Sequence, residues 1–460
     1  MVASRAACLL LVAAAAGVAA QSASTAANAS DGSGATTVNP AAASGAAWRS
    51  RSIYQLLTDR FGGPEVKQNC SDLNSYCGGS WEGILQHLDY IAGLNVDAVW
   101  SSPVMDQGYH GYHGFWPFDW CEVNPHFGTA GSLKRMLEAL NQRGFFNMLD
   151  VTANHVGYPT KGPAGLLYGT PFSDPAYFHN CTELSAAGVC APDCGIPLRD
   201  FQAPGGNASA LQEEQCRLVD LPDLNQSHPF VRQQLLQAWP AFMVQSYRTQ
   251  GVRVDACNHI TPAFAYDFLT SWGGAWAICE VWNWKPSRLG PYLQARGDAD
   301  YAFQNYLLWP ALRMCFARAL PEWPGYPFNT SCRLIPAAKA ELRSLGQDLG
   351  LMVNFIENHD VARFLFLRPS LAAYRNVLAV VLLDEGIPSL YYGTEQGYAG
   401  GSGKIPGGGE NREPLWPSSY TTSGELYTFV RMLNWYRNNL ALWQTNSTVV
   451  YSDDATYAFR

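Results

Sequence analysis

The sequence has few charged residues and no excess of basic ones. Charged residues make up 15% of its 460 residues, and 30 Lys and Arg stand against 38 Asp and Glu, a formal net charge of −8. A nucleic-acid partner, whose phosphates require a basic surface, is therefore not expected. No apolar run of eighteen or more residues follows the N-terminal segment, so we expect no membrane span. Because 47% of the residues are hydrophobic, the chain can bury a large core, which excludes disorder of the whole.

The first 47 residues lack the pattern of a folded domain. Arg5 precedes an apolar stretch that ends in small residues at Ala20, which is typical of a secretory signal peptide over residues 1–20. Residues 21–47 are almost all Ala, Ser, Thr, Gly and Asn, a composition that predicts a low-complexity linker. We therefore expect a secreted, extracellular protein. Asn-x-Ser/Thr sequons suit glycosylation in that route; they begin at Asn69, Asn180, Asn207, Asn225, Asn329 and Asn446.

The cysteines fit an oxidising compartment. Cys8 lies in the predicted signal peptide, which leaves eleven of the 12 cysteines in the mature chain. An odd number predicts that at least one thiol stays unpaired or pairs between chains. Cys70 and Cys77 close a short loop, Cys181, Cys190, Cys194 and Cys216 form a cluster, and Cys315 and Cys332 flank a Pro-rich bend. Cys121, Cys257 and Cys279 are isolated; we expect buried inert thiols, with a redox or metal role as the alternative.

From residue 48 onward, short apolar runs alternate with stretches of helical period such as 81–94 and 131–142. This alternation is typical of a parallel sheet covered by helices, and eight strands over about 350 residues predict a (β/α)₈ TIM barrel. The barrel is expected over residues 48–156 and 225–440. The rival is a doubly wound open sheet, but no Gly-rich phosphate loop follows the first strand. The predicted strands are 52–57, 96–101, 144–151, 251–256, 275–281, 298–303, 351–356 and 387–392.

Residues 157–224 interrupt this alternation after the third strand. They are rich in Gly, Pro, Cys and Asn and have little helical period. Long irregular segments inside a compact domain are usually functional excursions or small subdomains. The clustered cysteines predict a subdomain held together by disulfides.

Polar residues stand at the ends of the predicted strands. In a barrel of this kind, those positions face one mouth, where active sites are assembled. Acidic residues there could instead cap the following helices, but charged residues within an apolar strand such as 252–254 must be compensated when buried. The residues are Asp150, Asn154, His155, Arg253, Asp255, His259, Glu280, His359 and Asp360.

Five ordered motifs carry a resemblance to a known family. They are DVTANH (150–155), LPDLN (221–225), GVRVDACNH (251–259), EVWNW (280–284) and FIENHD (355–360). In this order they resemble the α-amylase family of retaining glycoside hydrolases. The segments SIYQLLTDRF, GGSWEGI, YHGFW and NRE look like the secreted fungal α-amylases in particular, and the resemblance runs from about residue 52 to 440.

The resemblance implies three catalytic carboxyls. Asp255 would be the nucleophile, Glu280 the general acid and then the base, and Asp360 would hold hydroxyls of the distorted sugar. Neighbouring charges are expected to raise the pKa of the acid, while Arg253 orients the nucleophile. The implied activity is endo-acting hydrolysis of α-1,4-glucosidic bonds in starch, glycogen and maltooligosaccharides, by a monomer. The expected substrate contacts are Arg253, His113, His155, His359, Phe115, Trp116 and Arg412.

The resemblance also implies a structural calcium ion and two disulfides. The expected ligands are Asn154, Asp223, the carbonyl of His259 and a carbonyl near Glu214, an all-oxygen set that suits Ca²⁺. Disulfides are expected between Cys70 and Cys77 and between Cys181 and Cys216. A local pair of Cys190 with Cys194 is the simplest expectation for the other two cysteines of the cluster.

Some positions depart from the family pattern. Asn258 stands where close relatives usually carry Lys, Cys279 replaces the usual Gly, and Phe115 stands where Tyr is typical. These departures leave two alternatives open: a transglycosylase or maltogenic enzyme acting on α-glucans, and a catalytically weak glucan-binding paralogue. Family members follow the barrel with an antiparallel β domain, which we expect to be truncated or absent, with residues 441–460 as its remnant.

Overall fold

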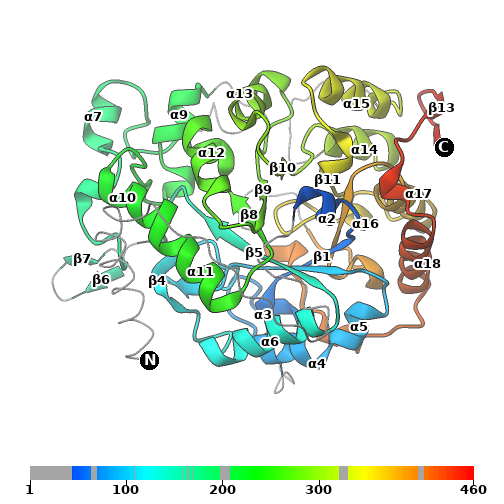
Figure 1. Cartoon of the computed structure of the whole chain (residues 1–460), viewed down its shortest axis with the longest axis horizontal. Helices are drawn as coiled ribbons and strands as arrows, with labels where there is room; N and C mark the ends of the chain where they lie inside the picture. Colours follow the sequence, from blue (N-terminus) through cyan, green and yellow to red (C-terminus); the bar gives the residue numbers. More distant parts are fainter. Residues whose placement is uncertain are drawn as a thin grey trace, which may run out of the picture.

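The computed structural model describes residues 44–63, 70–108, 110–158, 160–162, 165–167, 169–196, 208–320, 330–401 and 409–460 (Figure 1). The predicted signal peptide and residues 21–43 of the predicted linker lie outside the described residues. Among those that are described, no helix is both long and apolar enough to cross a membrane.

Eight parallel strands form the centre of the molecule, in the order β10-β9-β8-β5-β2-β1-β12-β11. A parallel bridge between Gln304 and Val353, next to the two end strands, brings the sheet close to a closed barrel. The predicted TIM barrel is confirmed, and each predicted strand overlaps an observed one. Their bounds are β1 (Ile53–Leu56), β2 (Ala98–Ser101), β5 (Phe146–Thr152), β8 (Gly251–Asp255), β9 (Trp276–Cys279), β10 (Tyr301–Phe303), β11 (Val353–Asn354) and β12 (Ile387–Tyr391).

The longer helices surround the barrel because they bury apolar residues against it. In α6, the Thr129 side chain accepts a hydrogen bond from Ser132 N and caps the first turn, and four buried apolar residues face the core. The helices are α2 (Gly45–Arg49), α3 (Thr58–Phe61), α4 (Trp81–Gln86), α5 (Leu88–Ala92), α6 (Ala130–Gln142), α7 (Cys181–Ala186), α9 (Ala210–Gln215), α10 (Pro229–Gln233), α11 (Trp239–Tyr247), α12 (Pro262–Thr270), α13 (Pro286–Arg296), α14 (Leu308–Phe316), α15 (Leu334–Ser344), α16 (Phe364–Leu367), α17 (Leu371–Leu383) and α18 (Glu425–Asn439).

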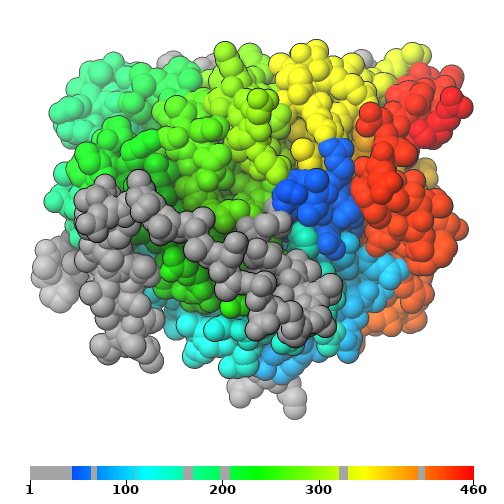
Figure 2. Space-filling view, viewed as in Figure 1, coloured from blue at the N-terminus to red at the C-terminus, as the bar shows by residue number. Residues whose placement is uncertain are grey.

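The short helix α2 closes the end of the barrel at which the strands begin. Its Trp48 is fully buried and lies 5.2 Å from Phe146 and 5.3 Å from Trp276, measured between ring centroids. The indole Nε1 donates a hydrogen bond to Gln250 O at 3.3 Å. Figure 2 shows α2 in blue at the surface, between the yellow and the red parts of the chain. Since this end is filled by Trp48, the opposite mouth is the one available to a substrate.

The excursion after β5 carries two small disulfide-linked helices and a short hairpin, β6 (Thr160–Gly162) with β7 (Gly165–Leu167). Its disulfides join Cys181 to Cys194 and Cys190 to Cys216. The expected Cys181–Cys216 and Cys190–Cys194 pairings are therefore wrong. The α7 residue Cys181 is bonded within its own loop, so that Cys190 is the residue that ties this loop to the end of α9.

Three further disulfides join pairs of described cysteines, and one of them was not expected. Cys70–Cys77 is confirmed, and Cys315 is bonded to Cys332. Cys257 and Cys279, predicted as inert thiols, form a disulfide because β8 and β9 are neighbours. Cys121 is also disulfide-bonded, and no described cysteine is free. The predictions of isolated thiols and of an unpaired one are thus wrong for the described chain.

After α18 the chain ends in a two-stranded antiparallel hairpin of β13 (Val449–Ser452) and β14 (Tyr457–Phe459). A buried Lys339 on α15 attaches this hairpin to the barrel. Its Nζ lies 2.8 Å from both Asp384 Oδ1 and Glu385 Oε1, and Tyr457 Oη donates to Asp384 Oδ2 at 2.9 Å.

Candidate active site

The candidate site lies where β8 and β9 end, at the mouth opposite to Trp48. Asp255 is the last residue of β8, and Glu280 follows β9 directly. The parallel register pairs Val254 with Cys279, and Glu280 N donates to Val254 O at 3.0 Å. Neighbouring strands therefore bring these two carboxyls to the same edge of the barrel, as the sequence predicted.

A single guanidinium connects the carboxyls. Arg253 is fully buried, with Nη1 2.7 Å from Asp255 Oδ1 and 3.0 Å from Asp150 Oδ1, and Nη2 2.5 Å from Glu280 Oε1. Gln304 Oε1 accepts from its Nε at 2.9 Å. Two carboxyls that share one guanidinium lie close together. This proximity suits a retaining glycosidase, in which the pair lies about 5 Å apart.

Burial raises the pKa values of both carboxyls. Burial, followed by repulsion from Asp255 and Asp360, raises the pKa of Glu280 to about 8, although Arg253 acts in the opposite direction. The Glu280 carboxyl accepts hydrogen bonds from Ala256 N at 3.0 Å and from Tyr306 Oη at 2.9 Å. Burial also raises the pKa of Asp255, but the Arg253 contact favours its ionised form. Glu280 can thus donate a proton at neutral pH, and Arg253 is the main group that favours the carboxylate form of Asp255.

Asp360 enters the site from the loop after β11. His359 Nε2 lies 3.1 Å from its Oδ2 and Arg412 Nη2 lies 3.5 Å from its Oδ1. Asn358 Oδ1 accepts from Asp360 N at 2.8 Å. Burial raises the pKa of Asp360, and Arg412 is the first group that opposes this rise. With 22% of its side chain exposed, Asp360 is the member of the trio most open to solvent.

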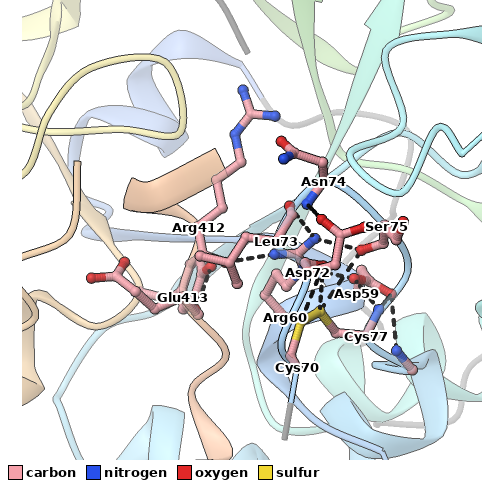
Figure 3. Close-up of a disulfide and its surroundings, with 12 residues drawn as sticks. Asp59, Arg60, Cys70, Asp72, Leu73, Asn74, Ser75, Cys77, Arg412 and Glu413 are labelled. Carbon is pink, nitrogen blue, oxygen red and sulfur yellow. Dashed lines mark hydrogen bonds and ion pairs between the residues drawn. A yellow bond between two sulfur atoms is a disulfide. The ribbon is translucent and has the colours of Figure 1, made fainter. Parts of the chain in front are cut away.

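The backbone of Arg412 is hydrogen-bonded to a buried arginine, Arg60. Arg60 Nη1 donates to Arg412 O at 2.8 Å, and its Nη2 donates to Leu73 O and Ser75 O in the Cys70–Cys77 loop. Asp59 accepts from Arg60 Nε at 2.7 Å. Figure 3 shows Arg60 between this disulfide loop and the backbone of Arg412. Arg412 in turn donates from Nε to His359 O at 2.8 Å, so the expected substrate residue also supports the Asp360 loop.

The three predicted histidines converge on the same mouth and are buried. His359 Nδ1 lies 2.8 Å from Gln55 Nε2; because an amide NH₂ can only donate, Nδ1 is the acceptor and Nε2 carries the proton toward Asp360. His155 Nε2 lies 3.0 Å from Phe115 O. Burial lowers the pKa of His113, His155 and His359, that of His155 to about 4. All three are neutral at pH 7 and suited to hydrogen-bonding a neutral ligand.

Two aromatic residues predicted to contact substrate lie among these histidines. The Phe115 ring stacks on His359 with centroids 4.8 Å apart and planes 4° apart. Trp116 packs edge-on to His113 at 4.6 Å. His113 Nδ1 accepts from Phe115 N at 3.0 Å, which fixes the turn that presents both rings. Flat faces of this kind can stack against sugar rings.

The expected calcium ligands lie where the excursion returns to the barrel. His155 and Asp223 form an antiparallel bridge, and Leu224 N donates to Asn154 O at 2.9 Å. Asn154 Oδ1 and Asp223 Oδ1 are buried without a hydrogen-bond partner, and burial raises the pKa of Asp223 to about 7. Its other oxygen lies 2.5 Å from His179 Nδ1. Two unpartnered buried oxygens fit a hard cation.

The other two expected calcium ligands, the carbonyl of His259 and a carbonyl near Glu214, would contribute backbone oxygens. His259 Nδ1 lies 3.0 Å from Glu213 O, which places α9, with Glu214, beside the turn after β8. Within the described ranges, no group of three or more His, Cys, Asp or Glu residues could hold a metal ion. A site here would therefore depend on amide and backbone oxygens in addition to Asp223.

Sequence reasoning did not single out several polar residues of the site. Gln55 hydrogen-bonds His359, and Gln304 hydrogen-bonds Arg253. Tyr306 hydrogen-bonds Glu280, and Asn358 accepts from the backbone of Asp360. Each lies in or shortly after a barrel strand, so its position in the sequence could have predicted a place at the mouth of the barrel.

Comparisons with known proteins agree with this geometry. Residues 30–270 match the α-amylase catalytic domain. Alpha-amylase 2 of Schwanniomyces occidentalis is 34% identical, with 90% of this chain and 76% of that protein covered; an alpha-amylase of Saccharomycopsis fibuligera is 32% identical, with 89% and 79% covered. The solved structure of an alpha-amylase from Malbranchea cinnamomea superposes with a TM-score of 0.75 and 31% identity, with 90% of this chain and 84% of that chain covered.

Proposed function

The chain belongs to the α-amylase family of glycoside hydrolases, and from this premise we propose how its residues perform the reaction. The family and its relatives support the hydrolysis of α-1,4-glucosidic bonds in starch. We assign the chemistry to Asp255, Glu280 and Asp360. The single observation that carries this assignment is the shared contact of Asp255 and Glu280 with Arg253.

Asp255 is the nucleophile of the first step. Its carboxylate oxygen bonds to the anomeric carbon while the bond from that carbon to the glycosidic oxygen breaks. Glu280 transfers its proton to the departing oxygen, so the leaving chain ends in a neutral hydroxyl. The products of this step are a glucosyl ester of Asp255 and an ionised Glu280.

Glu280 acts as the base in the second step. It removes a proton from a water molecule, whose oxygen bonds to the anomeric carbon while the ester bond to Asp255 breaks. Both carboxyls thereby return to their starting states. The buried Arg253 favours the ionised Asp255 throughout, and retention of configuration follows from two displacements at one carbon.

The surrounding residues hold the sugar in the cleaved position. We assign hydrogen bonds to the neutral His113, His155 and His359, and stacking to Phe115 and Trp116. Asp360, oriented by Arg412, would bind hydroxyls of the distorted ring. Because the charged side chains here are matched by buried partners, the remaining contacts suit a neutral ligand such as an α-glucan.

We propose calcium as a structural ion of this site. Asn154 Oδ1 and Asp223 Oδ1 would hold it, together with backbone carbonyls of His259 and near Glu214. Bound Ca²⁺ would supply a charge that offsets the buried Asp223 and would tie the excursion to the barrel. Chelation is expected to lower the thermal midpoint, with the loss reversed by added Ca²⁺ and not by Mg²⁺; an unchanged midpoint would contradict the assignment.

The catalytic assignment is tested on soluble starch. Glu280→Gln keeps the shape of the side chain but removes the transferable proton, so kcat should fall by roughly 10²–10⁴-fold. Glu341→Gln on α15, which is exposed, is the matched control and should retain full activity. Absence of starch cleavage by folded, calcium-supplied parent protein would overturn the function, and an active Glu280→Gln variant would overturn the role of Glu280.

We further propose that the protein is secreted and acts as a monomer. Five disulfides among the described residues suit an oxidising compartment. Recovery of the protein in the medium of a secretory host, and its elution at the mass of one chain, would support this proposal.

A further inference from the structure

The disulfide between Cys257 and Cys279 lies next to both proposed reacting carboxyls. Cys279 immediately precedes Glu280, and Cys257 is two residues after Asp255. Both cysteines are fully buried, and their Cα atoms lie 5.7 Å apart. The bond therefore cross-links the two segments that carry the nucleophile and the acid.

The cross-link begins where the backbone ladder between the two strands stops. The last paired residues of β8 and β9 are Val254 and Cys279, and Glu280 N to Val254 O is the last backbone hydrogen bond along them. Beyond this point, β8 turns away into the short 3₁₀ helix Cys257–His259. The disulfide is thus the covalent connection that replaces the ladder.

The turn that it fixes has an unfavourable backbone conformation. Ala256 adopts φ 52° and ψ 36°, a left-handed conformation that is unfavourable for a residue with a Cβ. In this conformation Ala256 N donates to Glu280 Oε2 at 3.0 Å. Relaxation of the turn to an ordinary conformation would remove that hydrogen bond and displace the residues on both sides of it.

We propose that the Cys257–Cys279 cystine is a positioning element of the active site: it fixes the Ala256 turn against Glu280 and holds the acid in register with Asp255. The inference rests on the proposed function. It adds to that function a pair of residues that touch neither substrate nor reacting atoms and act through Ala256 and Glu280.

The chain offers a matched control for this cystine. Cys315–Cys332 is also buried and closes a loop of similar sequence separation, 17 against 22 residues. Loop-closure entropy therefore predicts a similar loss of stability when either bond is removed. Cys315 lies on α14 and Cys332 precedes α15, on the outer layer of helices, so its loss should leave the catalytic pair in place.

The test compares C257A/C279A with C315A/C332A and with the parent protein, using a maltooligosaccharide of defined length at a temperature at which all three are folded. C257A/C279A should lose about tenfold or more in kcat, with little change in KM, because misplacement by a fraction of an ångström costs reactivity rather than binding. C315A/C332A should keep the parental kcat while losing similar thermal stability.

The pH dependence of kcat/KM distinguishes a loss of positioning at Glu280 from a general loss of stability. The groups facing Glu280 are Arg253, Asp255, Asp360 and Tyr306, and none of them is changed. Loss of the Ala256 N–H bond, which favours the ionised form, should move the basic limb of kcat/KM to higher pH in C257A/C279A but not in the control.

Each outcome decides the inference. Equal kcat in C257A/C279A and parent, or an equal loss in both double variants, would overturn it. If C257A/C279A does not fold, C257A alone, which keeps Cys279 as a buried thiol, should show the same loss of kcat, and parental kcat in C257A would overturn the inference. An inactive parent would instead overturn the proposed function, so the two failures are distinguishable.

Discussion

Replacing Tyr306 with Phe is expected to raise the pKa of Glu280 by about one unit. The Tyr306 hydroxyl donates to Glu280 Oε1 at 2.9 Å and itself accepts from Asn358 Nδ2 at 3.2 Å. Both tyrosine and carboxyl are buried, so water does not replace the lost donor. Tyr306→Phe keeps the ring that stacks on Trp282 at 5.5 Å and removes only the hydroxyl.

The magnitude follows from the difference between two hydrogen bonds. A donor to a charged group contributes about 1.5–3 kcal/mol, whereas the same donor to a protonated carboxyl contributes about 1 kcal/mol. The difference, about 0.5–2 kcal/mol, corresponds to roughly one pKa unit at 1.36 kcal/mol per unit. The lost bond favoured the ionised form, so the pKa rises and the protonated acid persists to higher pH. From about 8 in the parent, it should move to about 9.

The assay is the pH dependence of kcat/KM on a short maltooligosaccharide, which reports the pKa values of the free enzyme. Its basic limb, where Glu280 loses its proton, should move upward by about one unit, and the acid limb should stay. Tyr292→Phe is the control, because this buried tyrosine donates to the carbonyl of Ile260 at 2.9 Å. A basic limb that stays in place or moves downward in Tyr306→Phe would refute the reasoning.

Two further predictions concern the barrel itself. Trp48→Ala, which empties the closed end of the barrel, should cost about 3–5 kcal/mol, seen as a lower denaturation midpoint with kcat unchanged at low temperature; an unchanged midpoint would mean that Trp48 is not a core residue. Lys339→Met leaves Asp384 buried without its cation and Glu385 with Arg343 alone, and should also cost about 3–5 kcal/mol, whereas Lys134→Met, at an exposed i,i+4 pair, should have little effect.

The sequence predicted the barrel well because each strand is a short apolar run that the sheet buries on both faces. All eight predicted strands overlap observed ones, although β11 is reduced to Val353–Asn354 and β10 to Tyr301–Phe303. Both strands are shortened at their N-terminal ends, because residues 298–300 form a turn and bend and a 3₁₀ helix over Leu349–Leu351 precedes β11. The positions of Asp255 and Glu280 at strand ends were predicted from their motifs, and the structure places them there.

The disulfides were predicted poorly because sequence spacing does not fix connectivity. Four cysteines between residues 181 and 216 allow three pairings, and the observed one depends on how α7 and α9 pack. Cys257–Cys279 was missed for a different reason. Each cysteine is isolated in the sequence, and their proximity follows only from the neighbouring, in-register positions of β8 and β9 in the barrel. Knowledge of the predicted strand order could have revealed it.

The protonated state of Glu280 follows from the balance of charges in the mouth. Four buried or largely buried carboxyls, those of Asp150, Asp255, Glu280 and Asp360, contact two guanidiniums, those of Arg253 and Arg412. The three histidines add no cation, because burial lowers their pKa values. If all four carboxyls were ionised, the site would carry an uncompensated negative charge at low dielectric, which retention of a proton relieves. Glu280 keeps that proton at neutral pH, so the burial that makes the site costly to fold is also what supplies its acid.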